Sequence, residues 1–166
     1  EAEQACVARG GRICSTTEWQ AVVQASASPV CTYGYAPRGT SATGACQTGQ
    51  VAGSKYCNLG LYDFDTTTAG VQNALLPGGS SLLKNCWSDW SGLQGNTAAT
   101  NQVFDTTGNL REITKSSSTS YPLMGGAFTT LAESGAAQSF TFYAVASTFQ
   151  LYDTGFRCCF ASDPTL

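Results

Sequence analysis

The chain has 166 residues and a formal net charge of -3, with 8 Lys and Arg residues against 11 Asp and Glu residues. Only 11% of its residues are charged, against roughly a quarter in an ordinary soluble domain. This length is typical of one domain with a sizeable core. The acidic balance and the lack of a Lys or Arg run exclude an electrostatic footprint for nucleic acid or for an anionic membrane surface. We therefore expect one domain over residues 1–166 and no nucleic-acid partner.

Histidine is absent, whereas cysteine is abundant. Without histidine the chain has no Ser-His-Asp triad, no Cys-His pair and no His-ligated metal centre. The cysteines are even in number and lack the C-x-x-C spacing of zinc sites, which predicts disulfides and an oxidising compartment. No stretch approaches the roughly 20 apolar residues of a membrane span. Because the sequence begins at Glu1 rather than Met, we expect a mature or trimmed product that is secreted, periplasmic or at the cell surface.

A first helix is predicted over residues 1–9, EAEQACVAR, which combine good helix formers with acidic residues in the first turn. The pair Gly10-Gly11 ends it, and a short extended piece, RIC, follows. Ser15 and Glu18 then match a capping box, in which each side chain satisfies a backbone amide of the first turn. A second helix is therefore expected from about residue 16 to residue 25, with three residues on its buried face: Trp19, Val22 and Val23.

Residues 26–100 read as a loop region, because Gly, Ser, Thr and Asn recur there and apolar periodicity is weak. Half of the cysteines fall in this region, so we expect long, ordered, cross-linked loops. Strand signals return after residue 101 in the segments QVFD, LREIT, PLMGGAF, SFTFYAVA and TFQLYDTGFRCCF. The segments SFTF and TFQLY alternate apolar with polar residues, as strands with one wet face do. The predicted fold is α+β, with two N-terminal helices, a small antiparallel sheet and long disulfide-stapled loops.

The stretch FDTTGNLRE, residues 104–112, concentrates chemistry in a chain with few charges. Asp105 and Glu112 supply anionic oxygens, and Gly108 permits a sharp turn that can point carbonyls inward. Oxygens of Asp105, Gly108, Leu110 and Glu112 could surround one calcium ion, which takes about 6–8 oxygen ligands. The alternative is a tight turn with Asn109 in a left-handed conformation and Glu112 paired with an arginine, either Arg111 or Arg157. An acid/base pair of the two carboxylates is disfavoured, because carboxylates on one tight loop tend to share a cation.

Four segments together resemble the motifs of the formylglycine-generating-enzyme-like (sulfatase-modifying-factor) domain family, in the family's order. They are RICSTTEWQAV, FDTTGNLREIT, PLMGGAF and TGFRCC. The resemblance implies a C-type-lectin-like fold with the chain ends close together. It also implies a structural calcium held by the side chains of Asp105 and Glu112 and the carbonyls of Gly108 and Leu110. The family's N-terminal strands are missing, and Ile113 and Met124 replace a usual Trp and Arg.

The resemblance further implies a disulfide between Cys6 and Cys158. Neighbouring strand residues face opposite ways, so Cys158 should not bond Cys159, and we favour Cys14 as the partner of Cys159. The other four cysteines allow three connectivities. Of these we favour Cys46–Cys86 and Cys31–Cys57.

Enzymes of the family use a reactive cysteine pair shortly after the paired glycines. The corresponding stretch here, AFTTLAESGAAQSFTFYA, contains no cysteine. The iron-dependent sulfoxide-synthase relatives need histidines, and this chain has none. An enzyme of the formylglycine-generating or another oxidoreductase type is therefore the disfavoured alternative.

In the family, the segment between the paired glycines and the GFR strand lines the ligand-binding face, and some relatives vary it to display new specificities. Here that segment, residues 128–153, is rich in Thr, Ser, Ala and aromatic residues, with Glu133 and Asp153 as its only charges. We expect a neutral contact surface with Phe128, Tyr143, Phe149 and Tyr152 as ligand-binding residues. The sequence thus favours a non-catalytic secreted or cell-surface module that binds protein or carbohydrate, or that is a subunit of an extracellular assembly.

Overall fold

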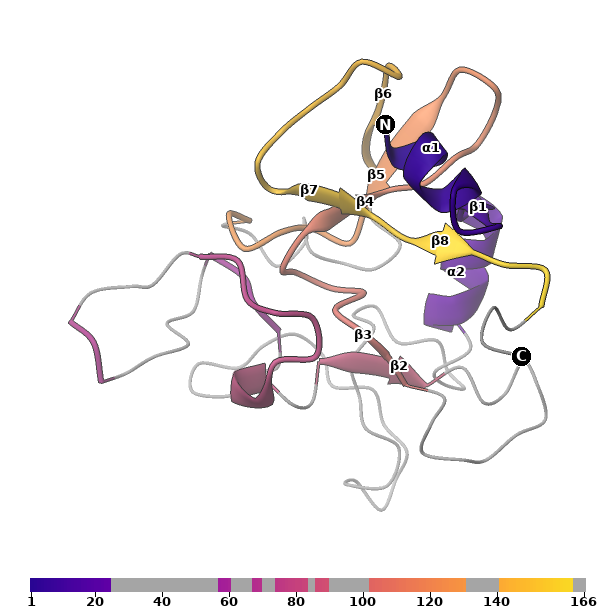
Figure 1. The fold of residues 1–166 in the computed structure, drawn as a ribbon. Helices are drawn as coiled ribbons and strands as arrows, with labels where there is room; N and C mark the ends of the chain where they lie inside the picture. The colour runs from indigo at the N-terminus through magenta and orange to yellow at the C-terminus, as the bar shows by residue number, and fades with distance from the viewer. Residues whose placement is uncertain are drawn as a thin grey trace.

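The computed structural model describes residues 1–24, 57–60, 67–69, 74–83, 86–89, 102–130 and 141–162. Two α-helices open the chain and most strands follow them, so the protein is α+β, as predicted (Figure 1). Within these ranges, no helix is long and apolar enough to cross a membrane. The elements are α1 Ala2–Val7, β1 Arg12–Ile13, α2 Thr16–Gln24, the 3-10 helix η1 Ser81–Leu83, β2 Trp87–Asp89, β3 Gln102–Phe104, β4 Arg111–Ile113, β5 Tyr121–Met124, β6 Thr141–Val145, β7 Thr154–Phe156 and β8 Cys158–Cys159.

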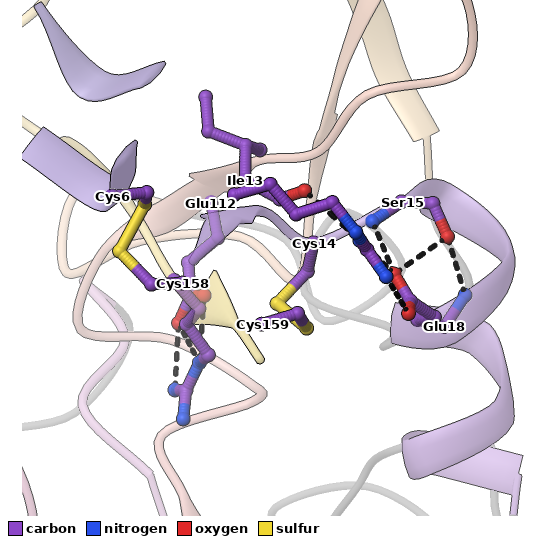
Figure 2. Close-up of a disulfide and its surroundings, with 10 residues drawn as sticks. Cys6, Ile13, Cys14, Ser15, Glu18, Glu112, Cys158 and Cys159 are labelled. Atoms are coloured by element: carbon purple, nitrogen blue, oxygen red, sulfur yellow. Dashed lines mark hydrogen bonds and ion pairs between the residues drawn. A yellow bond between two sulfur atoms is a disulfide. The ribbon is translucent and has the colours of Figure 1, made fainter. Parts of the chain in front are cut away.

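The predicted capping box starts α2. The Ser15 hydroxyl accepts a hydrogen bond from the Glu18 amide at 3.1 Å, and the Glu18 carboxylate accepts one from the Ser15 amide at 2.8 Å (Figure 2). Each side chain therefore satisfies a backbone donor that the first helical turn leaves open. Trp19 is buried as predicted and Val22 is half-buried, whereas the side chain of Val23 lies outside the described part of the chain.

Three small sheets carry the rest of the described fold. The largest has the strand order β6-β5-β4-β7, while β1 pairs with β8 and β2 pairs with β3. All pairings are antiparallel except that of β4 with β7, which is parallel. In Figure 1, β7 and β8 follow one another along the yellow end of the chain, from the four-stranded sheet to the N-terminal helices. The C-terminal strands therefore join the sheet to the helices.

Two predictions about strands are wrong. Strand β2 lies inside residues 26–100, where only loops were expected; its three residues are too few to show a period. The segment TFQLY, residues 148–152, forms turn and coil rather than a strand. There the Phe149 amide bonds back to the Ala146 carbonyl at 3.0 Å, which closes a turn. From this turn Phe149 packs on the core, whereas Leu151, the next apolar residue of the alternation, is exposed.

Two disulfides tie the N-terminal segment to β8 (Figure 2). Cys6 on α1 bonds Cys158, as the resemblance implied, and Cys14 bonds Cys159, as we favoured. The bonds span 152 and 145 residues of sequence. Because successive strand residues point to opposite faces, β8 can bond a different partner with each of its two cysteines. The two ends of the described chain are thereby held together covalently.

The third described disulfide corrects both remaining pairings. Cys57 bonds Cys86 across 29 residues, so neither Cys46–Cys86 nor Cys31–Cys57 forms. Cys57 and Cys86 are buried together with Leu83, and the half-buried Leu76 packs on them. The number and spacing of the cysteines in the sequence do not show which of them pair. The pairing of Cys57 with Cys86 follows from the small core that their two segments share. Cys31 and Cys46 lie outside the described residues.

Candidate functional site

The FDTTGNLRE loop is a strained, closely packed turn between β3 and β4. Asp105, Gly108 and Asn109 all have positive φ, at 56°, 74° and 61°. A β-carbon on Gly108 would lie 2.5 Å from the Asn58 carbonyl oxygen, so only glycine fits there. The Gly108 amide donates to the Gly125 carbonyl at 2.8 Å, which ties the loop to the two glycines, Gly125 and Gly126, that follow β5. The left-handed Asn109 of the tight-turn alternative is therefore present.

Asn109 joins the loop to three other segments of the chain. Its Nδ2 donates to the Leu76 carbonyl at 2.9 Å, and its Oδ1 accepts from the Leu76 amide and the Asn58 side chain, each at 3.0 Å. Its amide donates to the Asn58 carbonyl at 2.8 Å, and its carbonyl accepts from the Phe128 amide at 3.0 Å. Sequence reasoning recognised the left-handed turn but not this connecting role, because all the partners are distant in sequence.

Glu112 forms a buried ion pair with Arg157. The Arg157 Nε lies 2.7 Å from both carboxylate oxygens of Glu112, whose side chain is only 8% exposed. A terminal nitrogen of Arg157 donates to the Phe104 carbonyl at 2.5 Å, and the guanidinium carbon lies 5.6 Å from the centre of the Trp19 ring. The guanidinium is thus held by a carboxylate, a carbonyl and an aromatic face together. Arg157 was one of the two arginines that the tight-turn alternative named.

Asp105 adds a second carboxylate near the same guanidinium. Its Oδ2 accepts a hydrogen bond from the Gly79 amide at 2.8 Å. Burial raises the pKa of Asp105 above its ordinary value, against the opposing effects of the Gly79 amide and of Arg157. Burial likewise raises the pKa of Glu112, and the charge and hydrogen bonds of Arg157 oppose that rise. The arrangement places a buried carboxylate, Glu112, in an ion pair with Arg157 and a partly buried one, Asp105, near the same cation.

The residues predicted to bind calcium do not fit the ion as the structure places them. Both oxygens of Glu112 are engaged by Arg157, and one oxygen of Asp105 is engaged by a backbone amide. In the described part of the chain, no three Asp, Glu, Cys or His side chains gather as a metal site would require. The turn carrying Gly108 and Leu110 supplies a rigid backbone, but the Glu112 carboxylate that calcium would need is already paired with Arg157. Calcium binding stays a prediction, and the geometry favours the tight-turn alternative.

A second buried ion pair supports the segment that was expected to bind ligand. Arg111 of β4 donates to the Asp153 carboxylate at 2.7 Å, and the Thr129 hydroxyl contacts the same oxygen. Both charged side chains are largely buried. Asp153 was expected to be a charge on the contact surface. It instead anchors the turn after residue 150 to the four-stranded sheet.

The predicted ligand-binding residues differ in exposure. Phe128 is buried and meets Tyr152 edge-on, with 6.0 Å between ring centres, so it supports the surface rather than forming it. Tyr152 is 75% exposed. Tyr143 is exposed and packs edge-on against the half-buried Phe149, with 6.1 Å between ring centres. Phe128 is therefore covered where an exposed contact residue was expected, and its part in ligand binding stays a prediction.

An open groove of about 500 Å³ lies beside these aromatic residues. The N-terminal residues 1–3, the ends of β5 and β6, and residues 146–151 line it. Leu151 and Phe156 line the groove and are each 41% exposed. Sequence reasoning missed both, since neither residue type nor spacing shows that a strand end and a turn will expose apolar side chains. Tyr152 follows Leu151, and Tyr143 packs on Phe149, which also lines the groove. We call these exposed residues, Tyr143, Leu151, Tyr152 and Phe156, the apolar face.

Comparison of the chain with protein-family models, with curated proteins and with solved structures gives no match.

Proposed function

We propose that the chain is a non-catalytic binding module of a secreted or cell-surface protein, and that it binds a protein partner through the apolar face. The observation that carries this proposal is the exposure of Leu151 and Phe156 in one groove, together with the exposed Tyr152 next to Leu151 and Tyr143 packed on Phe149. Single exposed apolar residues are ordinary on protein surfaces, whereas a gathered set marks an interaction site. Tyrosine and phenylalanine are also enriched in protein interfaces.

The rigidity of the support favours binding over chemistry. The buried pair of Arg111 and Asp153 and the ring contact of Phe128 with Tyr152 hold the turn that presents the face. A surface held in place before binding loses less conformational entropy when a partner docks. The six described cysteines are all in disulfides, so none of them offers the thiolate that a cysteine enzyme would use. These disulfides also suit an oxidising compartment.

A protein partner suits the face better than a carbohydrate. Leu151 and Phe156 offer apolar surface without hydrogen-bonding groups, which matches the apolar core of a protein interface. The same surface suits a subunit contact within an extracellular assembly. We propose further that the chain is a non-catalytic relative of the formylglycine-generating-enzyme-like family with a C-type-lectin-like fold. The order of its four motifs and the Cys6–Cys158 bond support that relationship.

The binding proposal is tested by affinity capture from the secreted and surface proteins of the native source. Two of the baits are the natural chain and the double variant Leu151→Ser/Tyr152→Ser, which replaces two large apolar side chains of the face with polar ones. The matched control is Leu82→Ser on η1, because Leu82 is exposed but does not line the groove. We expect one protein to be retained by the natural chain and the control and lost by the double variant. Equal retention by all three baits would contradict the proposal, and selective glycan-array binding lost in the double variant would indicate a carbohydrate ligand.

A further inference from the structure

We propose that Arg157 is the built-in cation of the FDTTGNLRE loop: its guanidinium takes the place that a bound calcium ion would otherwise fill. This inference is independent of the proposed binding function. It concerns how the acidic side chains of the loop, the buried Glu112 and the partly buried Asp105, are compensated, and therefore whether the loop needs a metal ion.

The first ground is the match between the groups around Arg157 and the groups that a hard cation takes. The guanidinium contacts the Glu112 carboxylate through both oxygens and the Phe104 carbonyl. The Asp105 carboxylate acts on the same guanidinium electrostatically. A carboxylate and a backbone carbonyl in contact with the cation, and a second carboxylate nearby, are also the kinds of oxygen group that calcium prefers. The guanidinium of arginine holds its N–H donors in a planar, rigid arrangement, which matches the two oxygens of a carboxylate.

The second ground is that Arg157 has a feature that a metal site would lack. Its guanidinium lies over the Trp19 ring, with 5.6 Å from its central carbon to the ring centre. An indole face stabilises a weakly hydrated organic cation such as guanidinium. Trp19 is buried on α2 and packs against Met124 of β5. The aromatic wall therefore suits arginine, and it occupies a side from which calcium would otherwise draw another oxygen.

The third ground is connectivity. Arg157 stands between β7 and β8 and precedes Cys158, which is bonded to Cys6. Its contacts reach β3 through Phe104, β4 through Glu112 and α2 through Trp19. The cation is thus attached to the chain and cannot be removed by a chelator. The loop should keep its structure whether or not calcium is present.

Thermal unfolding of the natural chain and of Arg157→Ala tests the proposal, each with chelator and with millimolar calcium. We expect the natural chain to unfold at the same temperature in both conditions. Arg157→Ala leaves Glu112 buried without its partner, so its melting temperature should fall by roughly 10 °C in chelator. Calcium should then restore about 3–5 °C, because it supplies the missing positive charge to the loop oxygens. The control Glu112→Gln/Arg157→Ala, which lacks the Glu112 charge, should show no restoration.

A calcium-dependent rise in the natural chain would overturn the proposal, since the loop would then hold a metal beside Arg157. A lack of calcium restoration in Arg157→Ala would overturn it as well. If Arg157→Ala does not fold, Arg157→Lys and Arg157→Gln provide the test. The lysine variant keeps the charge and should melt higher than the glutamine variant, whereas an equal or reversed order would contradict a cationic role.

Discussion

The FDTTGNLRE loop and the apolar face contrast in which side chains the fold covers and which it leaves exposed. The loop holds the most conspicuous polar residues of the chain, yet Asn109 and Glu112 are buried and bonded within the protein. The face is built from ordinary apolar residues, yet Leu151 and Tyr152 are exposed. A polar group bonded inside the protein stabilises it, whereas an exposed apolar group gains free energy only when something covers it. Function is therefore better sought at the face than at the loop.

Of the three changes Asn109→Ala, Glu18→Gln and Leu151→Ser/Tyr152→Ser, the first should show the largest effect on stability. The change removes the side-chain hydrogen bonds with Leu76 and Asn58 and leaves buried backbone groups unpaired. It also places alanine at a φ of 61°, which asparagine tolerates better. At about 1 kcal/mol for each lost bond, and more for unpaired partners, the free energy of unfolding should fall by roughly 3 kcal/mol. Urea denaturation measures it, and a loss below about 1 kcal/mol would show that Asn109 does not hold the segments together.

Glu18→Gln should have a smaller effect that depends on pH. Hydrogen bonds from Arg12, followed by those from Ser15, lower the pKa of Glu18 from 4.5 to about 2, against a cost of burial. A lowered pKa means that the ionised form adds stability above pH 4.5, and that this stability is lost as the pH falls towards about 2. Because the Glu18 side chain is 38% exposed, solvent screening limits the contribution to about 1 kcal/mol.

Melting temperatures of the natural chain and Glu18→Gln at a series of pH values measure this contribution. The two proteins should differ at neutral pH and converge in strong acid. Glutamine keeps a polar side chain at the capping position, so the difference reports the charge. A difference that stays constant with pH would mean that the charge does not contribute.

The double variant Leu151→Ser/Tyr152→Ser should change stability least, even though it is expected to abolish binding. Surface substitutions away from buried features usually stay within about 0.5 kcal/mol. The midpoint of urea denaturation should therefore hardly move, even though Leu151 is one of the residues that line the groove. A decrease of several kcal/mol in the free energy of unfolding would mean that these residues belong to the core. The face would then not differ from the loop in its contribution to stability.

Predictions from the sequence succeeded where the chemistry is local. The capping box joins Ser15 to a residue three positions away, so its hydrogen bonds follow from the helix itself. The turn at Gly108 and Asn109 also follows from residues that accept positive φ. Predictions failed for TFQLY, residues 148–152, where a turn set against the core imitates the alternation of a strand. The burial of Phe128 was not predicted either, because residue type alone does not show which side of the chain faces solvent.

The sequence by itself indicated that this protein is α+β and that the six cysteines of the described residues form disulfides, and it offered the tight turn between two strands as an alternative. Composition and local propensity suffice for those conclusions, because they depend on neighbouring residues and on counts. Only the tertiary structure decided that Cys57 meets Cys86, and that the Glu112 carboxylate meets an arginine 45 positions away. Such partners are chosen by packing, since a buried charge takes whichever opposite charge the fold brings within reach.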